Sequence, residues 1–512
     1  MGRTRRDFIR YVVAGSVAAG CPVDLELMAE PVPSRPEVHG EENEICHQVR
    51  DGRRFRRPPV SARYDVVIVG GGISGLSAAY FLKDRDYLLL EKDAHFGGNA
   101  YVEEFEGQAY ATGSAFVTED ETTLIGLAKE IGLEMLPVNQ LDATIVKGEL
   151  VRDIWNEGAD RLPYPASVRE SFKKFRRDML AIKTDEREKE LDGQPFTHYM
   201  RGYAPEIKQW WDGFGPSNWG ARAYETSALV GVGAMSWVSP EDGRDTRIAW
   251  PGGNGAIARR LAEIHNEKHR ERVLTGATTV AVEPQRDEVQ ITYVHQGAVR
   301  RVAAKAVIMA APKFITAHLV AGIPARQKAA MQRIRYAPYP VVNLIFDQPV
   351  FRGSFDTWCP GNAFTDMIVA DWTIRNRPGY SPKYNILTCY TPMAEYDRGW
   401  LLRESGCRTI ARRVLRDFRK LKPEFHVDPV EVHIYRRGHP MFMSTPGTHT
   451  RLLPAARTPM ERVFFANTDS EGPLSTADGA IHQAQKAVEW INKKQEAGGR
   501  RQARGISIQV GA

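Results

Sequence analysis

The sequence predicts a mixed α/β fold in which a Rossmann-like dinucleotide-binding domain is interleaved with a second domain of mixed sheet and helices. A continuous apolar, β-branched run over 65–69 leads directly into the glycine-rich turn 70–75 and a helix, which is the order of a dinucleotide-binding βαβ unit. Glycine-rich turns between strands and helices recur near residues 97, 252 and 472, as expected of a chain that returns several times to one long ligand. Between them, 165–235 has helical spacing and many aromatic side chains, and such residues more often fill a core than bind a ligand.

Composition places the chain among ordinary globular proteins. Its 512 residues are 42% hydrophobic and 26% charged, which excludes a disordered chain, a collagen-like fibre and a protein with many membrane spans. The formal charge is +6, but a basic tail over 496–512 and the two lysines before it hold most of that excess, so no nucleic-acid-binding face is predicted. The five cysteines are too few for a disulfide scaffold and have no metal-ligand spacing, and no metal site is predicted.

The first 30 residues predict an export signal rather than part of the fold. Arg5 and Arg6 precede the apolar stretch 11–20, which is too short to span a bilayer. The arginine pair is similar to a twin-arginine signal, the export route of proteins that fold before they cross the membrane, so we expect a periplasmic protein. Cys21 would allow a lipid anchor and, with it, peripheral association with the membrane. Residues 31–62 show no apolar periodicity and are interpreted as a linker.

The turn after the first strand has the pattern of a dinucleotide site. Gly70 permits a tight turn, Gly72 lets the backbone approach a pyrophosphate, and Gly75 allows the helix to pack closely on the strand. The first turn of the helix presents its free N–H groups to the phosphates. A second apolar strand over 87–90 ends at Glu91, where an acid can accept hydrogen bonds from ribose hydroxyls. The residues predicted to bind the dinucleotide here are Gly70, Gly72, Ile73, Ser74, Gly75, Glu91 and Lys92.

Five further segments extend this pattern along the chain: 92–99, 108–116, 250–255, 305–312 and 462–481. With the glycine turn, and in this order, they resemble the flavin-containing amine oxidase superfamily, which includes protoporphyrinogen oxidases and phytoene and other carotenoid desaturases. The resemblance implies FAD as the cofactor and a C-terminal strand and helix that close over the flavin. The additional FAD-binding residues that it implies are Gly97, Gly98, Asn99, Gly113, Ser114, Val280, Asp469 and Ala477.

The resemblance also implies a chain that passes repeatedly between two domains. The expected parts of the FAD-binding domain are 63–135, 246–320 and 451–495, and those of the substrate domain are 136–245 and 321–450. A nicotinamide-dependent protein would instead keep its cofactor within one doubly wound unit.

Three departures from the family pattern bear on the chemistry. Many amine oxidases of the superfamily have a lysine that is linked through water to the flavin N5 and to reactivity with oxygen. Alignment puts Gln327 in that place, and the neighbouring Lys328 is turned away by about 100° on a helix. Thr476 stands where amine oxidases place one aromatic side chain over the flavin, while Asn99 and Asn467 replace an arginine and a glycine. The first two departures argue against an oxidase and against a simple amine as the substrate.

No catalytic residue can be named, because the flavin supplies the redox chemistry and amine oxidation needs little acid–base help. His439 and His449 lie in a loop-like segment that could border the substrate cavity. The leading hypothesis is a periplasmic FAD-dependent dehydrogenase that takes a hydride from a C–N bond of a small-molecule amine and passes electrons to a quinone or a cytochrome. One alternative is a C–C desaturase of an isoprenoid or porphyrinogen-like substrate, which an extended apolar cavity without acidic residues would favour. The other is a flavoprotein with a structural FAD that serves as a binding partner.

Overall fold

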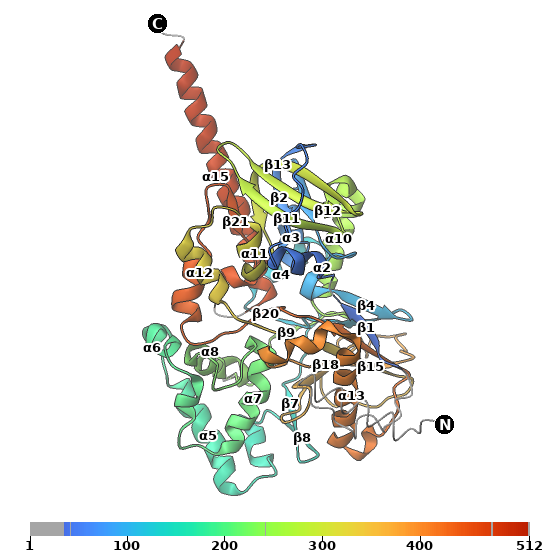
Figure 1. Cartoon of the computed structure of the whole chain (residues 1–512). Coiled ribbons are helices and arrows are strands. Elements are labelled where there is room, and N and C mark those ends of the chain that lie inside the picture. The colour runs from blue at the N-terminus through green and yellow to red at the C-terminus, as the bar shows by residue number, and fades with distance from the viewer. Residues whose placement is uncertain (1–34, 41, 241, 473–474, 510–512) are drawn as a thin grey trace, which may run out of the picture.

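The computed structural model describes residues 35–40, 42–240, 242–472 and 475–509, so the predicted export signal lies outside the described residues. The chain forms a mixed α/β fold with two sheets, one in each domain, and passes between them several times (Figure 1). The fold class is therefore as predicted. Among the described residues, no helix combines the length and the apolar character that crossing a membrane requires.

The sheet of the dinucleotide-binding domain has the order β10-β3-β2-β13-β12-β11, and β21 pairs with β13 as well. β2 (Arg63–Val69) lies parallel to β3 (Tyr87–Leu90) on one side and to β13 (Ala298–Met309) on the other. Val66–Val69 are buried, as a continuous apolar run predicts for a strand covered on both faces. The remaining strands are β10 (Val273–Leu274), β11 (Ala277–Pro284), β12 (Val289–His295) and β21 (Val463–Phe465).

Helices cover both faces of this sheet. One face, which carries Ile68, packs against α3 (Ile73–Phe81), α4 (Thr122–Glu130), α10 (Gly255–His269) and α15 (Ala477–Gln509). The other face, which carries Val67, packs against α11 (Lys313–Leu319), α12 (Ala325–Arg333) and α14 (Leu453–Ala456). α15 continues into the predicted basic tail as far as Gln509 and projects from the body (Figure 1).

The sheet of the substrate domain has the order β1-β19-β15-β18-β17-β16-β7-β8. α13 (Glu404–Leu421) packs its buried side chains against this sheet. The strands are β1 (Glu37–Gly40), β7 (Ala143–Val146), β8 (Glu149–Arg152), β15 (Val341–Phe346), β16 (Asp356–Trp358), β17 (Asp366–Val369), β18 (Asn385–Tyr390) and β19 (Glu431–Arg436). Three two-stranded pairs complete the strands: β4 (Val102–Phe105) with β5 (Gln108–Ala111), β6 (Val117–Thr118) with β9 (Arg247–Ile248), and β14 (Tyr336–Ala337) with β20 (Met441–Phe442).

A helical layer adds a separate aromatic core to the substrate domain. It consists of α5 (Ala166–Leu180), α6 (Glu188–Asp192), α7 (Pro205–Trp219), α8 (Ala228–Gly233) and α9 (Met235–Val238). Trp210, Trp211 and Trp219 are buried in it, whereas Trp237 is 41% exposed. Most aromatic residues of this stretch thus fill a core, whereas Tyr224 and Trp237 are exposed.

Two predicted boundaries differ from the structure. The expected linker 31–62 contains β1, which adds a parallel strand to the edge strand β19, and α2 (Glu44–Arg50), which packs on α11 and β11. The strand was missed because it is short and half-exposed, so it shows no apolar alternation. The segment 321–335, assigned by sequence to the substrate domain, buries Met331 of α12 in the core of the dinucleotide-binding domain.

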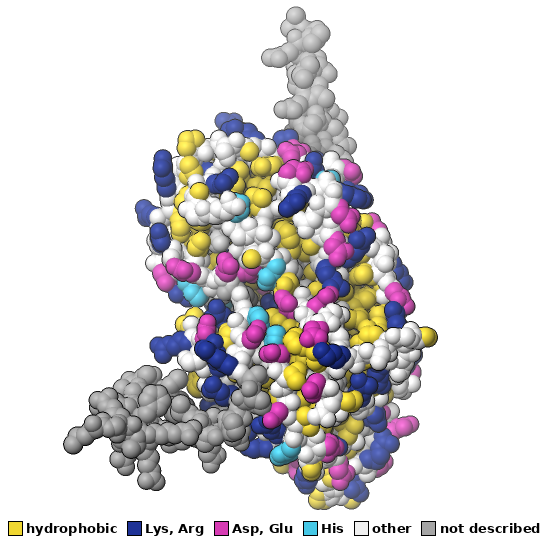
Figure 2. All heavy atoms as spheres, turned by 90° about the vertical axis from the view of Figure 1, so that its right-hand side faces the viewer, with side chains coloured by type: hydrophobic (Ala, Val, Ile, Leu, Met, Phe, Trp, Pro, Cys, Tyr) yellow, Lys and Arg dark blue, Asp and Glu magenta, His cyan; other side chains and the backbone are white. Residues whose placement is uncertain are grey.

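Charged side chains of both signs are mixed on the face that Figure 2 shows. Figure 2 shows basic and acidic side chains interspersed over one face of both domains, with no large patch of one sign on the described part of that face.

Candidate active site

A cavity of about 1120 Å³ is lined by both domains. The dinucleotide-binding domain contributes the glycine turns and the C-terminal ends of its parallel strands, where ligands bind in doubly wound folds. The substrate domain contributes strands β16 and β17, part of α7 and the segment after β19. Of the predicted FAD-binding residues, those that line the cavity are Gly70, Gly72, Ile73, Ser74, Glu91, Lys92, Gly97, Gly98, Asn99, Gly113, Ser114 and Ala477.

The first glycine turn has the geometry that a dinucleotide requires. Gly70 has φ +107°, and a Cβ there would lie 2.7 Å from the carbonyl oxygen of Ala310. A Cβ at Gly75 would collide with the carbonyl oxygen of Gly70, so only glycine permits this contact of helix and strand. α3 begins at Ile73 with no side-chain cap, which leaves the N–H groups of its first turn free for an anion.

The second glycine turn packs on the first. The N–H of Gly97 donates to the carbonyl of Gly71 at 2.9 Å, and Gly98 has φ +56°. Glu91 is buried between the two turns and accepts hydrogen bonds from the N–H groups of Gly71 (2.5 Å) and Asp93 (2.8 Å). Burial raises the pKa of Glu91. Lys92, beside it, forms an ion pair with Asp93 at 2.7 Å.

A buried arginine from the substrate domain reaches these turns. Arg437 donates to the carbonyl of Gly98 at 2.8 Å and to the carbonyl of Thr112 at 3.0 Å. Asn99 instead donates to the carbonyl of Pro440 at 2.7 Å. Positive charge is therefore present beside the Gly97–Gly98 turn although the arginine that many family members have after that turn is an asparagine here.

Three predicted FAD-binding residues lie outside the lining of the cavity. Gly75 is behind the first turn, and Val280 is buried in the core on the other side of β11, while its neighbours Thr278 and Thr279 line the cavity. Asp469 forms a buried ion pair with Lys313 at 2.7 Å and accepts a hydrogen bond from Tyr336 at 2.6 Å.

The prediction for Gln327 is wrong. Gln327 lies on α12, and its amide donates to the carbonyls of Ala456 and Thr458, outside the lining of the cavity. Thr476 and Asn467 do line the cavity. Of the two histidine candidates, His439 borders the cavity and stacks on Phe314, with its pKa lowered to about 3 by burial, whereas His449 does not border it.

Sequence reasoning missed a group of buried carboxylates in the substrate part of the cavity. On β16, Asp356 and Trp358 face the cavity and Thr357 points away; on β17, Asp366 and Ile368 face it. The two strands pair Trp358 with Asp366 and Asp356 with Ile368, so both carboxylates are on one face of the sheet. Asp356 and Asp366 are 1% and 3% exposed.

One arginine neutralises only part of this charge. Arg247 is buried, donates to Asp245 at 2.8 Å, forms a short hydrogen bond with Asp142, and is 3.8 Å from Asp356. The second carboxylate oxygen of Asp356, Oδ1, is buried with no hydrogen-bond partner among the described residues. Burial, together with Asp142 and Asp366, raises the pKa of Asp356 well above its usual range.

Asp366 ends a chain of hydroxyl groups. Its Oδ1 accepts hydrogen bonds from Ser217 at 2.8 Å and from Thr365 at 2.5 Å, and Ser217 is 2.7 Å from the hydroxyl of Tyr339. Burial raises the pKa of Asp366 to about 7, while the two hydroxyl donors lower it. This places a proton acceptor that titrates near neutral pH in the wall of the cavity.

The parallel strands and the two packed glycine turns, in which a Cβ at Gly70 or Gly75 would meet backbone atoms, define a dinucleotide-binding fold. The chain belongs to the flavin-containing amine oxidoreductase family, whose model matches residues 73–492. The residues that line the cavity fit FAD, which accepts a hydride when it is bound: the turns around Gly72 and Gly98 would hold the pyrophosphate, and Glu91 the ribose.

Relatives and solved structures agree with this family. Oxidoreductase PigB of Serratia sp. (strain ATCC 39006) is 23% identical over 496 residues, which cover 81% of this chain and 73% of PigB. Amine oxidase [flavin-containing] A of Canis lupus familiaris is 41% identical over 91 residues, 17% of each chain. Cyclohexylamine oxidase from Brevibacterium oxydans IH-35A has a TM-score of 0.67 at 21% identity, covering 85% of this chain and 99% of that one. Wild-type putrescine oxidase bound to putrescine has a TM-score of 0.63 at 19% identity, covering 84% and 99%. These two structures support the fold alone.

Proposed function

We propose that this protein is an exported FAD-dependent dehydrogenase that takes a hydride from the C–N carbon of a cationic amine and passes the electrons to a quinone or a cytochrome. The observation that carries the proposal is the pair of buried carboxylates, Asp356 and Asp366, in the wall of the cavity. Buried carboxylates without a full partner are costly, and an ammonium group would neutralise them. An apolar isoprenoid would leave them uncompensated, so the desaturase alternative loses support.

Some residues of the cavity would bind the charged group of the amine, and others its carbon skeleton. Asp356, whose buried Oδ1 has no hydrogen-bond partner among the described residues, would attract the ammonium group by its charge, while Phe214, Trp237 and Trp358 provide apolar wall for the carbon skeleton. The amine must be neutral when the hydride leaves, because the lone pair on nitrogen stabilises the cation that forms at carbon. Asp366, with a pKa of about 7, is suited to accept the proton of the ammonium group, and Ser217 and Tyr339 hold its carboxylate in place.

The identity of the electron acceptor rests on a different observation, now that Gln327 is known to lie elsewhere. Among the described residues that line the cavity, the only lysine is Lys92, which pairs with Asp93 at the dinucleotide end. No described lysine thus occupies the substrate end, where the lysine linked to oxygen reactivity would stand. This supports transfer to a quinone or a cytochrome, and the arginine pair near the N-terminus, Arg5 and Arg6, supports export to the periplasm, where such acceptors meet the membrane.

Anaerobic mixing of the FAD-loaded protein with a panel of amines tests the proposal. Bleaching of the oxidised flavin spectrum by an amine is the expected result, followed by reoxidation that is fast with a quinone and slow with air. Reoxidation by air at the rate of turnover would refute the dehydrogenase assignment. If dithionite reduces the flavin but none of the amines does, amine oxidation is refuted. The desaturase and the structural-FAD alternatives would then be the ones to test.

A further inference from the structure

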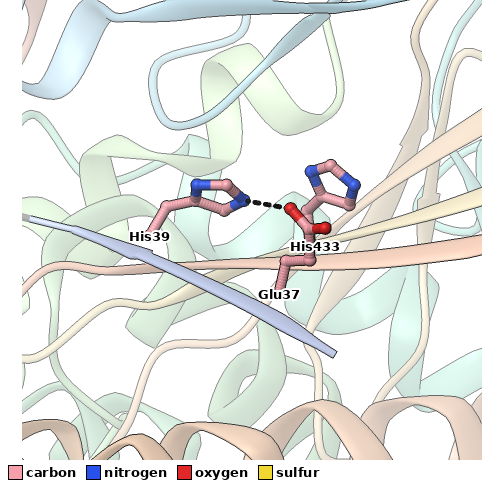
Figure 3. A group of neighbouring side chains, drawn as sticks. All are labelled: Glu37, His39 and His433. Atoms are coloured by element: carbon pink, nitrogen blue, oxygen red, sulfur yellow. Dashed lines mark ion pairs between the residues drawn. The ribbon is translucent and has the colours of Figure 1, made fainter. Parts of the chain in front are cut away.

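Two histidines and a glutamate come together where the N-terminal segment joins the substrate-domain sheet. β1 runs parallel to β19, with Glu37 opposite His433 and His39 opposite Tyr435. Because side chains alternate along a strand, Glu37, His39 and His433 share one face of the sheet, as Figure 3 shows. One carboxylate oxygen and one nitrogen of each imidazole all lie within 4.8 Å of one another.

Both imidazoles offer a nitrogen that has no hydrogen-bond partner. Nε2 of His39 and Nε2 of His433 are buried atoms without a partner among the described residues. Nε2 of His39 is 3.6 Å from the carboxylate of Glu37, too far for a hydrogen bond. A buried polar atom left without a partner costs free energy, so a pair of them facing one carboxylate calls for a ligand that all three can share.

Neighbouring groups fix the positions of both rings. The hydroxyl of Tyr110 is 3.2 Å from Nδ1 of His433, on the opposite side of the ring from the free Nε2. His39 stacks on Tyr435 at 4.7 Å between ring centroids and on His433 at 5.1 Å. A hydrogen bond to the second ring nitrogen is the usual support of a metal-binding histidine, because it fixes the tautomer and the ring orientation.

We propose that Glu37, His39 and His433 bind a Zn²⁺ ion. Two imidazoles and one carboxylate form a common zinc ligand set, with water as the fourth ligand. Donors bound to a tetrahedral zinc ion at about 2.0–2.1 Å lie about 3.4 Å apart, close to the 3.6 Å that separates Nε2 of His39 from the carboxylate of Glu37. The three donors lie within 4.8 Å of one another, so binding one ion requires rotation of the side chains of His39 and Glu37 at the exposed edge of the sheet. His39 must then leave its stacked position on His433.

The ion would fasten the segment that covers one end of the cofactor cavity. β1 leads into α2, whose Cys46, His47 and Arg50 line the cavity, and α2 packs on α11 and β11 of the dinucleotide-binding domain. A metal ion shared by β1 and β19 therefore ties this segment to the substrate domain while α2 lies against the other domain. Zn²⁺ then slows the escape of FAD, because the segment must move before that end of the cavity opens.

The proposal is tested with tag-free, FAD-loaded protein that has been freed of metal. Calorimetric titration with ZnCl₂ is expected to give one equivalent of bound zinc, and Co²⁺ in its place is expected to give the intense visible bands of a tetrahedral site. His39→Gln and Glu37→Gln remove a ligand at the exposed edge and are each expected to weaken Zn²⁺ binding at least about tenfold. His426→Gln, an exposed histidine outside the cluster, is the matched control and should bind as the wild type does.

The second readout is the rate at which FAD fluorescence appears after dilution. Zn²⁺ is expected to slow FAD release in the wild type and in His426→Gln but not in His39→Gln. Absence of a stoichiometric site, or equal affinity in His39→Gln, Glu37→Gln and His426→Gln, overturns the metal site. Unchanged FAD release with zinc bound overturns its role in holding the segment.

Discussion

Substitution of Asp366 by asparagine isolates one charge in the substrate part of the cavity. The asparagine retains an oxygen that can accept the hydrogen bonds from Ser217 and Thr365, so the hydroxyl chain is kept and only the negative charge is lost. An ion pair at 4 Å is worth about 4 kcal/mol at the effective dielectric constant of a protein site, and desolvation of the cation opposes much of this. The net loss expected is that of a hydrogen bond to a charged group, about 1.5–3 kcal/mol, or roughly 10- to 150-fold weaker amine binding.

The prediction also specifies how the affinity for the amine changes with pH. Burial raises the pKa of Asp366 to about 7 in the empty cavity, so the carboxyl must lose its proton before it can bind a cation. Amine affinity is therefore expected to rise as pH increases toward 7 and to level off above it, and Asp366→Asn should lose this rise. The dissociation constant is measured from the change in the oxidised flavin spectrum, under conditions where the amine binds but does not yet react.

As pH rises, the free energy of unfolding should fall while the affinity for the amine rises. The folded protein holds a proton on Asp366 up to about pH 7, whereas an unfolded aspartate releases it near pH 3.9. The free energy of unfolding therefore falls as pH rises through this window, and Asp366→Asn is expected to raise the melting temperature at pH 8. Asp371→Asn is the matched control: Asp371 is 6% exposed and outside the cavity, and burial raises its pKa as well. Equal affinity and equal pH dependence in the wild type and Asp366→Asn would refute the assignment of this carboxylate to the amine.

Two further substitutions test the cofactor end and its support. Gly75→Ala is expected to yield protein without FAD, because the added carbon meets the carbonyl of Gly70 and overpacking costs about 1–3 kcal/mol. Gly126→Ala, with open space around it, is the control and should keep its flavin. The ratio of flavin to protein absorbance measures the FAD content of both variants. Lys313→Met leaves Asp469 charged and buried and should lower the free energy of unfolding by about 3–5 kcal/mol in urea titration, so an unchanged midpoint would count against that pair.

The dinucleotide end was predictable because its determinants are local. Gly70, Gly72 and Gly75 follow one strand within six residues. Gly70 has a positive φ that favours glycine, and Gly75 leaves no space for a Cβ. Glu91 ends the next strand, where parallel pairing brings it to the same edge of the sheet as the turn. Each of these inferences needs only the order of elements along a short stretch of chain.

The substrate part of the cavity could not be predicted from the sequence in the same way, because strand register and long-range packing bring its residues together. Asp356 and Asp366 face the cavity only because β16 pairs with β17 in one particular register, and Arg247 joins them from more than 100 residues away. Long-range packing also explains the wrong prediction for Gln327. Sequence similarity over a few residues of a helix could not show that α12 packs on the face of the dinucleotide-binding sheet that carries Val67. The zinc ligands His39 and His433 are nearly 400 residues apart in sequence, so no spacing pattern could join them.

The proposed preference for a cationic amine rests on the charge of the cavity. Asp142 and Asp245 are already engaged by Arg247, which leaves Asp356 with a contact at 3.8 Å and Asp366 with hydroxyl donors alone. Burial raises the pKa of both carboxyls, that of Asp366 to about 7. Below that pH both are neutral and form no ion pair with a ligand, and an anion is repelled once they ionise. A cationic amine instead stabilises their charged form, and transfer of its own proton to Asp366 afterwards restores the neutral carboxyl. In the proposed reaction, Asp366 would thus both attract the ammonium ion and accept its proton, which leaves the neutral amine that hydride transfer requires.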